Sequence, residues 1–159
     1  MTIQREGLVA SVWSKLLHVF FRVHRGLTIG VRAVVRSKDG KFLLVRHTYT
    51  SGWHFPGGGV EVNETAEEAL ARELEQETGL HLIGSPNVHG IFFNESVSKH
   101  DHVLVYLCGT RDDAPLKSTS LEIAEVGFFA LGHLPDDIDQ GTKRRLQEIT
   151  KKAQISRKW

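Results

Sequence analysis

A glycine turn followed by a carboxylate-rich helix, within residues 58–80, constrains this chain more than any other feature. The segment reads Gly58-x5-Glu64-x7-Arg72-Glu73-Leu74-x-Gln76-Glu77-x-Gly79-Leu80. Thr65 and Glu68 form a capping-box pattern and Gly79 is placed to end a helix, so the sequence predicts a helix over residues 65–78. The spacing of the acids suits the binding of a divalent metal and a diphosphate.

One face of this predicted helix continues an apolar stripe into two carboxylates, Glu73 and Glu77. Positions i, i+3, i+4, i+7 and i+11 hold Ala66, Ala69, Leu70, Glu73 and Glu77. Two like charges one turn apart in a partly dry place are costly unless a cation or hydrogen bonds compensate. A hard ion such as Mg²⁺ meets that need. Glu64, at the start of the helix, could close the same cluster.

The opposite face of the helix carries Glu68, Arg72 and Glu75 and is expected to be solvated. Glu68 and Arg72 are one turn apart, which predicts a surface ion pair between them. Seven acids and one base give residues 61–80 a net charge of −6, in a chain whose formal net charge is +1. This distribution indicates a cation site on a mildly basic body and gives no argument for nucleic acid as a partner.

The order of predicted elements indicates a mixed α/β or α+β sandwich in a single domain over residues 1–159. A chain of 159 residues is long enough to bury a core. The predicted strands cover residues 27–36, 41–47, 80–83, 88–94, 102–111 and 125–129. Helices are expected over residues 65–78 and 142–153, and residues 1–26 form a helical extension to a core of residues 27–153.

The N-terminal extension has apolar residues at helical spacing within residues 8–24, which predicts packing on the domain or a homodimer contact. Contact with a membrane surface is the less favoured alternative for this segment. No stretch is long and apolar enough to span a bilayer and no signal-peptide cleavage site follows, so we expect a cytoplasmic protein. The single cysteine, Cys108, excludes an intramolecular disulfide and is expected to be a buried thiol.

The segment from Gly58 to Leu80 resembles the Nudix box, G-x5-E-x7-R-E-U-x-E-E-x-G-U with U an aliphatic residue. Eight of the nine fixed positions match, and Gln76 replaces the first glutamate of the pair. The flanking sequences also resemble this family: Trp53-x-Phe55-Pro56-Gly57-Gly58 before the box, and Glu122, Phe128-Phe129 and Leu134-Pro135 after it. The resemblance covers roughly residues 27–153.

The resemblance implies an α/β/α sandwich with a mixed sheet, and hydrolysis of a small-molecule nucleoside diphosphate derivative by water with Mg²⁺ or Mn²⁺. Glu73 and Glu77 would be the metal ligands, supported by Glu64, and Arg72 would orient them through ion pairs. The metal set implied by the resemblance is Glu73, Glu77, Gly58 and Glu122, with Glu125 as second choice for the last. Glutamine at 76 predicts retained activity with weaker binding of metal, or with fewer ions, because an amide oxygen brings no charge.

Arg32, Arg46 and His47 lie on or near the strands that would flank this site, and they are the expected phosphate contacts. Further substrate contacts are expected from the loop of residues 95–101, because loops on a rigid scaffold carry specificity. Within it, His100-Asp101-His102 is interpreted as an ordinary loop-to-strand junction rather than a metal cluster.

Two other functions remain open from the sequence. A Nudix fold weakened by Gln76 could bind a nucleotide or nucleotide sugar as a sensor, although the intact glutamates favour an enzyme. Isomerase chemistry of the isopentenyl-diphosphate type is disfavoured, because Cys108 falls in a strand after the box.

Overall fold

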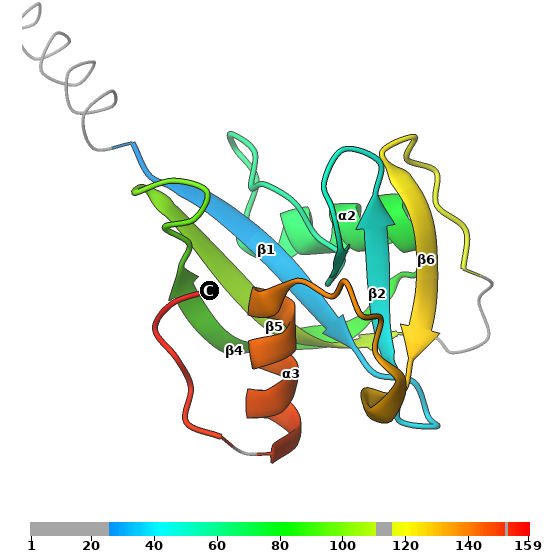
Figure 1. Cartoon of the computed structure of the whole chain (residues 1–159). Coiled ribbons are helices and arrows are strands. Elements are labelled where there is room, and N and C mark those ends of the chain that lie inside the picture. The colour runs from blue at the N-terminus through cyan, green and yellow to red at the C-terminus, as the bar shows by residue number, and fades with distance from the viewer. Residues whose placement is uncertain (1–25, 111–115, 152) are drawn as a thin grey trace, which may run out of the picture.

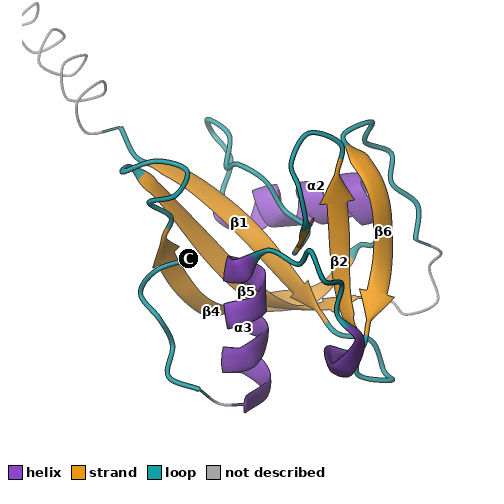
Figure 2. Cartoon of the chain, in the orientation of Figure 1, coloured by secondary structure: helices purple, strands orange, loops and turns teal. Residues whose placement is uncertain are grey.

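The computed structural model describes residues 26–110, 116–151 and 153–159, so the helix predicted within residues 8–24 lies outside the described part. Two three-stranded sheets form the body (Figures 1 and 2). The first has the order β1-β5-β4, with β1 at Thr28–Val35, β5 at Asp101–Thr110 and β4 at Leu82–Phe93. The second has the order β3-β2-β6, with β3 at Trp53–His54, β2 at Phe42–His47 and β6 at Ile123–Phe129.

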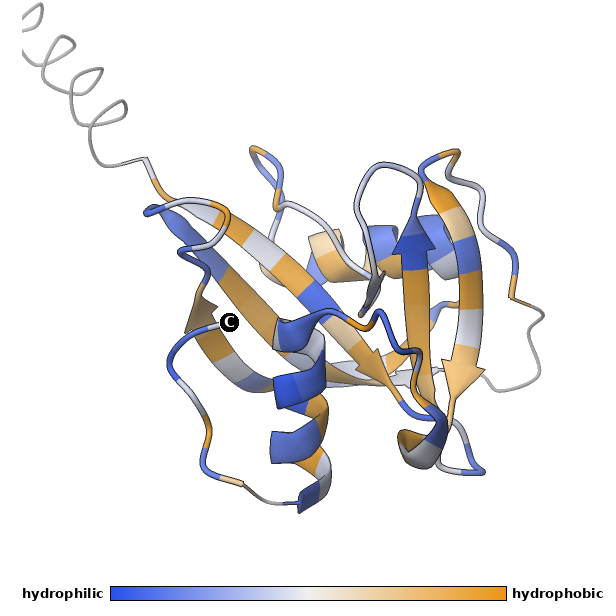
Figure 3. Ribbon diagram, viewed as in Figure 1, coloured by the Kyte–Doolittle hydropathy of each residue, from blue (hydrophilic) through white to orange (hydrophobic). Residues whose placement is uncertain are grey.

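Two helices cover opposite sides of these strands, α2 at Ala66–Thr78 behind them and α3 at Gln140–Lys151 in front in Figure 1. Successive residues of β1 alternate between two hydrophobic clusters. Val31, Ala33 and Val35 pack with α2, whereas Val34 packs in the cluster that contains Leu146 of α3. Figure 3 shows largely apolar strands and, in front of them, α3 with hydrophilic residues on its outward side. The expected α/β/α sandwich is therefore confirmed.

The first sheet is mixed, because β1 runs parallel to β5 whereas β4 runs antiparallel to it. The sequence predicts separate strands over residues 80–83 and 88–94, but the structure has one long strand, β4. Its pairing with β5 shifts between Ile83 and Asn87 and again between Val88 and Gly90. Gly84 has a left-handed φ of 68°, and Pro86 has no backbone N–H, so the turn signals mark bulges within one strand.

Helix α3 begins two residues before its predicted start because Asp139 caps it. The Oδ2 atom of Asp139 accepts a hydrogen bond from the backbone N–H of Thr142 at 2.7 Å. A short 3₁₀ turn at Leu131–His133 precedes this helix. Among the described residues, no helix is long and apolar enough to cross a membrane.

A buried ion pair on α3 ties the chain's last residues to the body. Arg145 is fully buried, and its guanidinium binds both carboxylate oxygens of Glu148 at 2.8 and 2.6 Å. It also lies over the ring of Phe92, 3.8 Å from the ring centroid, and donates to the carbonyl of Lys158. Trp159 then donates its backbone N–H to the carbonyl of Phe93 at 3.0 Å, which places the indole beside β4.

Candidate active site

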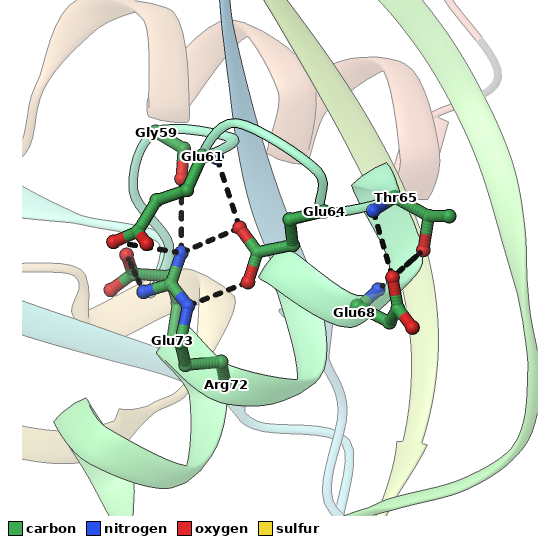
Figure 4. A network of polar contacts seen from close by, with 7 residues as sticks. All are labelled: Gly59, Glu61, Glu64, Thr65, Glu68, Arg72 and Glu73. Atoms are coloured by element: carbon green, nitrogen blue, oxygen red, sulfur yellow. Dashed lines mark hydrogen bonds and ion pairs between the residues drawn. The ribbon is translucent and has the colours of Figure 1, made fainter.

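The capping box predicted for α2 is present and fixes where the helix begins. The Thr65 hydroxyl accepts from the Glu68 backbone N–H at 3.2 Å, and the Glu68 carboxylate accepts from the Thr65 N–H at 2.8 Å (Figure 4). These hydrogen bonds lower the pKa of Glu68. Gly79, in the left-handed conformation, ends the helix as expected. The helix therefore presents Glu73 and Glu77 towards the body, one turn apart.

Arg72 organises the acids at the start of the helix, and it contacts Glu64 instead of Glu68. Its Nε and Nη2 atoms donate to the two oxygens of Glu64 at 2.7 and 2.9 Å, and its Nη1 atom donates to Oε1 of Glu73 at 2.7 Å (Figure 4). Nη2 also reaches the carbonyl of Gly59. The predicted surface pair is wrong because the loop before the helix brings a carboxylate to Arg72 from outside the helix, which helical periodicity cannot reveal.

Glu64 is held as a carboxylate by this arrangement. The hydrogen bonds from Arg72 lower its pKa to about 2, and the backbone N–H of Glu61 adds to the effect. Arg72 donates hydrogen bonds to both oxygens of Glu64. Glu64 therefore supports the cluster by fixing Arg72, which binds Oε1 of Glu73 and leaves Oε2 of Glu73 unengaged by this ion pair.

Glu77 is a buried carboxylate, with 5% of its surface exposed. Its Oε2 atom accepts a hydrogen bond from the backbone N–H of Gly57 at 2.7 Å, and Oε1 lies 3.6 Å from Nε2 of His47. The pKa of Glu77 is raised to about 7, chiefly by burial and also by the carboxylates of Glu73 and Glu122, which together outweigh the Gly57 hydrogen bond and the charge of Arg32. A desolvated acid near other acids is the environment that a hard cation relieves, so the donor chemistry fits Mg²⁺ or Mn²⁺.

The loop that holds Glu77 is fastened to the edge of β1. Gly58 accepts from the N–H of Val31 at 2.8 Å, and the guanidinium of Arg32 donates to the carbonyl of Gly57. Gly57 has a φ of 144°, and a Cβ atom there would lie 2.0 Å from the carbonyl oxygen of Val31. Only glycine fits this position, and its N–H is thereby aimed at Glu77.

The next glycine is required for a different reason. A Cβ atom on Gly58 would lie 2.3 Å from Oε1 of Glu73, the oxygen that Arg72 holds. Since Glu73 is fixed by that ion pair, an added methyl group would displace its carboxylate.

We therefore expect Gly58→Ala to slow hydrolysis roughly 10²-fold, because small displacements of a reacting group have effects of this size. Steady-state kinetics with a hydrolysed substrate measures the change. Gly59→Ala is the matched control, since no atom lies within 4 Å of a Cβ placed there. Equal rates for the two variants would contradict the contact between Gly58 and Glu73.

Of the two late carboxylates considered, Glu122 lies near Glu77 and Glu125 does not. The pKa of Tyr49 is raised by burial and then by the carboxylates of Glu122 and Glu77, so these groups share one space. Glu125 instead forms an ion pair with Arg46 across β6 and β2.

A groove of about 490 Å³ runs past the glycine loop. Its walls include two of the three predicted phosphate contacts, Arg32 and His47, and parts of the loop of residues 95–101. Arg46 is not among its lining residues. Sequence reasoning missed Asn94 and Trp159, which also line the groove. Asn94 adjoins the loop that was expected to carry contacts, whereas no sequence signal marks Trp159, which the C-terminal segment brings there.

A second hollow, of about 510 Å³, lies on the outer side of α2. Gln76, which is exposed, lines it together with Glu75, His81 and Lys117. Glu73 and Glu77 line neither hollow. The groove beside the glycine loop is the better candidate for chemistry, because its lining residues Gly57 and His47 both contact the carboxylate of Glu77.

The NUDIX domain model matches residues 26–149 of the chain. The chain belongs to the Nudix family. A MutT NUDIX hydrolase from Burkholderia pseudomallei has a similar structure, with a TM-score of 0.66 and 25% identity, over 77% of this chain and 98% of that one. A MutT-like protein of Streptomyces ambofaciens is 28% identical over 113 residues, which are 71% of this chain and 68% of that protein.

The similarity to another relative is higher but covers fewer residues. An RNA pyrophosphohydrolase of Halorhodospira halophila is 47% identical over 55 residues, which are 35% of this chain and only 30% of that protein. The chain thus spans under a third of that relative's length.

Proposed function

We propose that this Nudix protein is a metal-dependent hydrolase that cleaves the diphosphate linkage of a nucleoside diphosphate derivative with water as the nucleophile. The observation that carries the proposal is the buried Glu77 carboxylate, which contacts Gly57 and His47 of the groove wall and is influenced by the charges of Glu73 and Glu122. Relatives named pyrophosphohydrolase and diphosphatase support the reaction class.

The donors proposed for Mg²⁺ or Mn²⁺ are the carboxylates of Glu73, Glu77 and Glu122 and the carbonyl oxygen of Gly58. Within the described ranges, no group of three or more His, Cys, Asp or Glu side chains is placed to hold a metal by itself. Waters and phosphate oxygens would therefore complete the coordination, as is usual for Mg²⁺. When bound, the ion supplies electrostatic stabilisation of the diphosphate and lowers the pKa of the attacking water.

The protein's own groups have distinct tasks in this proposal. Arg72, fixed by Glu64, orients Glu73 through its ion pair. Glu77 or Glu73 would accept the proton of the attacking water. Arg32 brings a positive charge to the groove wall for the phosphates, while its link to the Gly57 carbonyl steadies the loop.

A panel of compounds tests the function, and its members are chosen from the activities for which the relatives are named. We expect the protein with Mg²⁺ to hydrolyse at least one of 5′-triphosphorylated RNA, 8-oxo-dGTP, ADP-ribose and a UDP-linked compound. Chromatography of the products measures the reaction. In ¹⁸O-water, one product should carry one ¹⁸O atom from the attacking water. EDTA and Glu73→Gln should each abolish turnover. Metal-dependent binding without turnover of any compound would instead establish the sensor.

The isomerase alternative receives no support from the position of Cys108. The thiol lies on β5, half-buried, and burial raises its pKa to about 12. It donates to the carbonyl of Tyr106 and does not line the groove. A thiol that stays protonated away from the acids is unsuited to that chemistry.

We also propose that residues 1–159 form a single domain, that the protein works in the cytoplasm, and that residues 8–24 make a homodimer contact.

The homodimer contact is supported by four exposed apolar side chains on the side of the first sheet that faces α2, close to the start of β1. They are Leu27, Ile29, Val88 and Ile91, each more than 40% exposed. Light scattering of the intact chain and of Phe20→Asp tests the contact.

A further inference from the structure

His47, the last residue of β2, is a buried polar side chain beside the proposed metal ligands. Only 7% of its side chain is exposed. The pairing of β2 with β6 shifts between Arg46 and His47, and the imidazole packs between Tyr49 and His54, with ring centroids 5.2 and 5.9 Å away. The ring is thus fixed by its neighbours rather than free in the groove.

Among the hydrogen bonds and ion pairs of the described residues, the one that involves this ring joins it to the carboxylate of Glu77. Nε2 of His47 lies 3.6 Å from Oε1 of Glu77, while Nδ1 is buried and has no hydrogen-bond partner. A carboxylate beside Nε2 favours an N–H on that nitrogen, in the neutral ring as in the imidazolium.

The Glu77 carboxylate is therefore approached from two sides. The Gly57 N–H holds Oε2 at 2.7 Å, and His47 stands against Oε1. A single hydrogen bond leaves the terminal torsion of a glutamate free to turn, because that torsion has a broad energy profile. A second N–H beside the other oxygen limits this freedom, and at 3.6 Å this contact is longer than an ordinary hydrogen bond.

We propose that His47 is a positioning residue, whose Nε2–H and the Gly57 N–H together hold the Glu77 carboxylate in the orientation that binds the metal. This inference rests on the proposed function and replaces a phosphate contact as the task of His47. Outer partners of metal ligands have this effect generally, and their loss weakens metal affinity by roughly 10–100-fold.

Three variants of the full-length protein separate this task from packing and from substrate contact. His47→Gln can place an amide N–H near the position of Nε2, His47→Asn can place one only near Nδ1, and His47→Phe keeps an aromatic ring without a donor. Isothermal titration with Mn²⁺, without substrate, measures metal binding directly. We expect the Mn²⁺ affinity of His47→Gln to lie within about 3-fold of the wild-type value. The Mn²⁺ affinity of His47→Asn and of His47→Phe should be lower than wild type by roughly 10-fold or more.

Each outcome bears on the proposal. Equal Mn²⁺ affinity in all four proteins, with a raised KM in the variants, would show that His47 contacts substrate and would overturn it. Equally weak binding by Gln, Asn and Phe would also overturn it, because the Nε2–H would then not be what matters. Should His47→Phe fail to fold, the comparison of Gln with Asn still decides. Mn²⁺ binding by a protein that hydrolyses nothing would refute the hydrolase while leaving this test intact.

Discussion

Replacing Glu77 with glutamine is expected to abolish hydrolysis and, at the same time, to stabilise the metal-free protein at pH 8. The loss of activity follows from removing a charged metal ligand, which we expect to slow the reaction roughly 10³-fold, or about 4 kcal/mol of transition-state stabilisation. The gain in stability follows from the pKa of Glu77, which burial raises to about 7 from its ordinary value of 4.5. Glutamine can still accept the Gly57 N–H, so the loop keeps its anchor.

The direction of the stability effect depends on pH in a defined way. Because the folded protein binds the Glu77 proton more tightly than the unfolded chain, this residue favours folding fully below pH 4.5, and that contribution is lost as the pH rises to about 7. The difference amounts to roughly 3 kcal/mol at pH 8. Urea unfolding in EDTA should give Glu77→Gln a higher free energy of unfolding than wild type at pH 8 and an equal one at pH 4.5. Saturating Mg²⁺ should remove the advantage. A variant no more stable than wild type at pH 8 would refute the assigned cost of burying this charge.

Glu148→Gln is expected to produce the largest loss of stability in the protein. It leaves the fully buried Arg145 without its carboxylate, and breaking one partner of a buried pair costs about 3–5 kcal/mol. The same change weakens the acceptor for the Ser156 N–H and for His89, which also bind Glu148. Burial raises the pKa of Glu148, but the hydrogen bonds from Arg145, Ser156 and His89 outweigh it and lower the pKa overall. This stabilisation is therefore present at neutral pH and is lost as acid protonates Glu148.

Chemical unfolding at pH 7 measures this effect, and the chain offers a matched control. Glu95 pairs with Lys158 at the surface, where the two side chains are 53% and 63% exposed. Glu95→Gln should change the free energy of unfolding by less than about 1 kcal/mol. The double variant Arg145→Met with Glu148→Leu should recover most of the loss, since apolar replacement of a buried pair is often neutral. A Glu148→Gln protein as stable as the Glu95 variant would contradict the burial of an unpaired charge.

Local signals account for what the sequence could predict. The capping box of Thr65 and Glu68 and the terminating Gly79 act within a few residues, so the helix and its face with Glu73 and Glu77 were predictable from spacing alone. The resemblance to the Nudix box added the layered fold, which the structure confirms.

Contacts between distant segments account for what the sequence could not predict. Arg72 has neighbours one turn away on its helix, but the loop supplies Glu64, and nothing in helical periodicity indicates that choice. The sequence made Glu122 the first choice and Glu125 the second, and the register of β6 against β2 places Glu125 beside Arg46. The parallel pairing of β1 with β5 joins segments some 70 positions apart, and the hydrogen bond from Trp159 to Phe93 joins the C-terminal segment to β4, so neither contact has a local signature.

The three consecutive glycines before the helix are unequal, and this has a practical consequence. Glycine is required at position 57 by the backbone conformation and at position 58 by the close approach of the Glu73 carboxylate. A Cβ atom at position 59 would meet no atom within 4 Å. Position 59 can therefore accept a cysteine that carries a fluorophore or spin label. Such a probe would sit one residue from Gly58 of the proposed metal site and would report metal binding there without a known substrate.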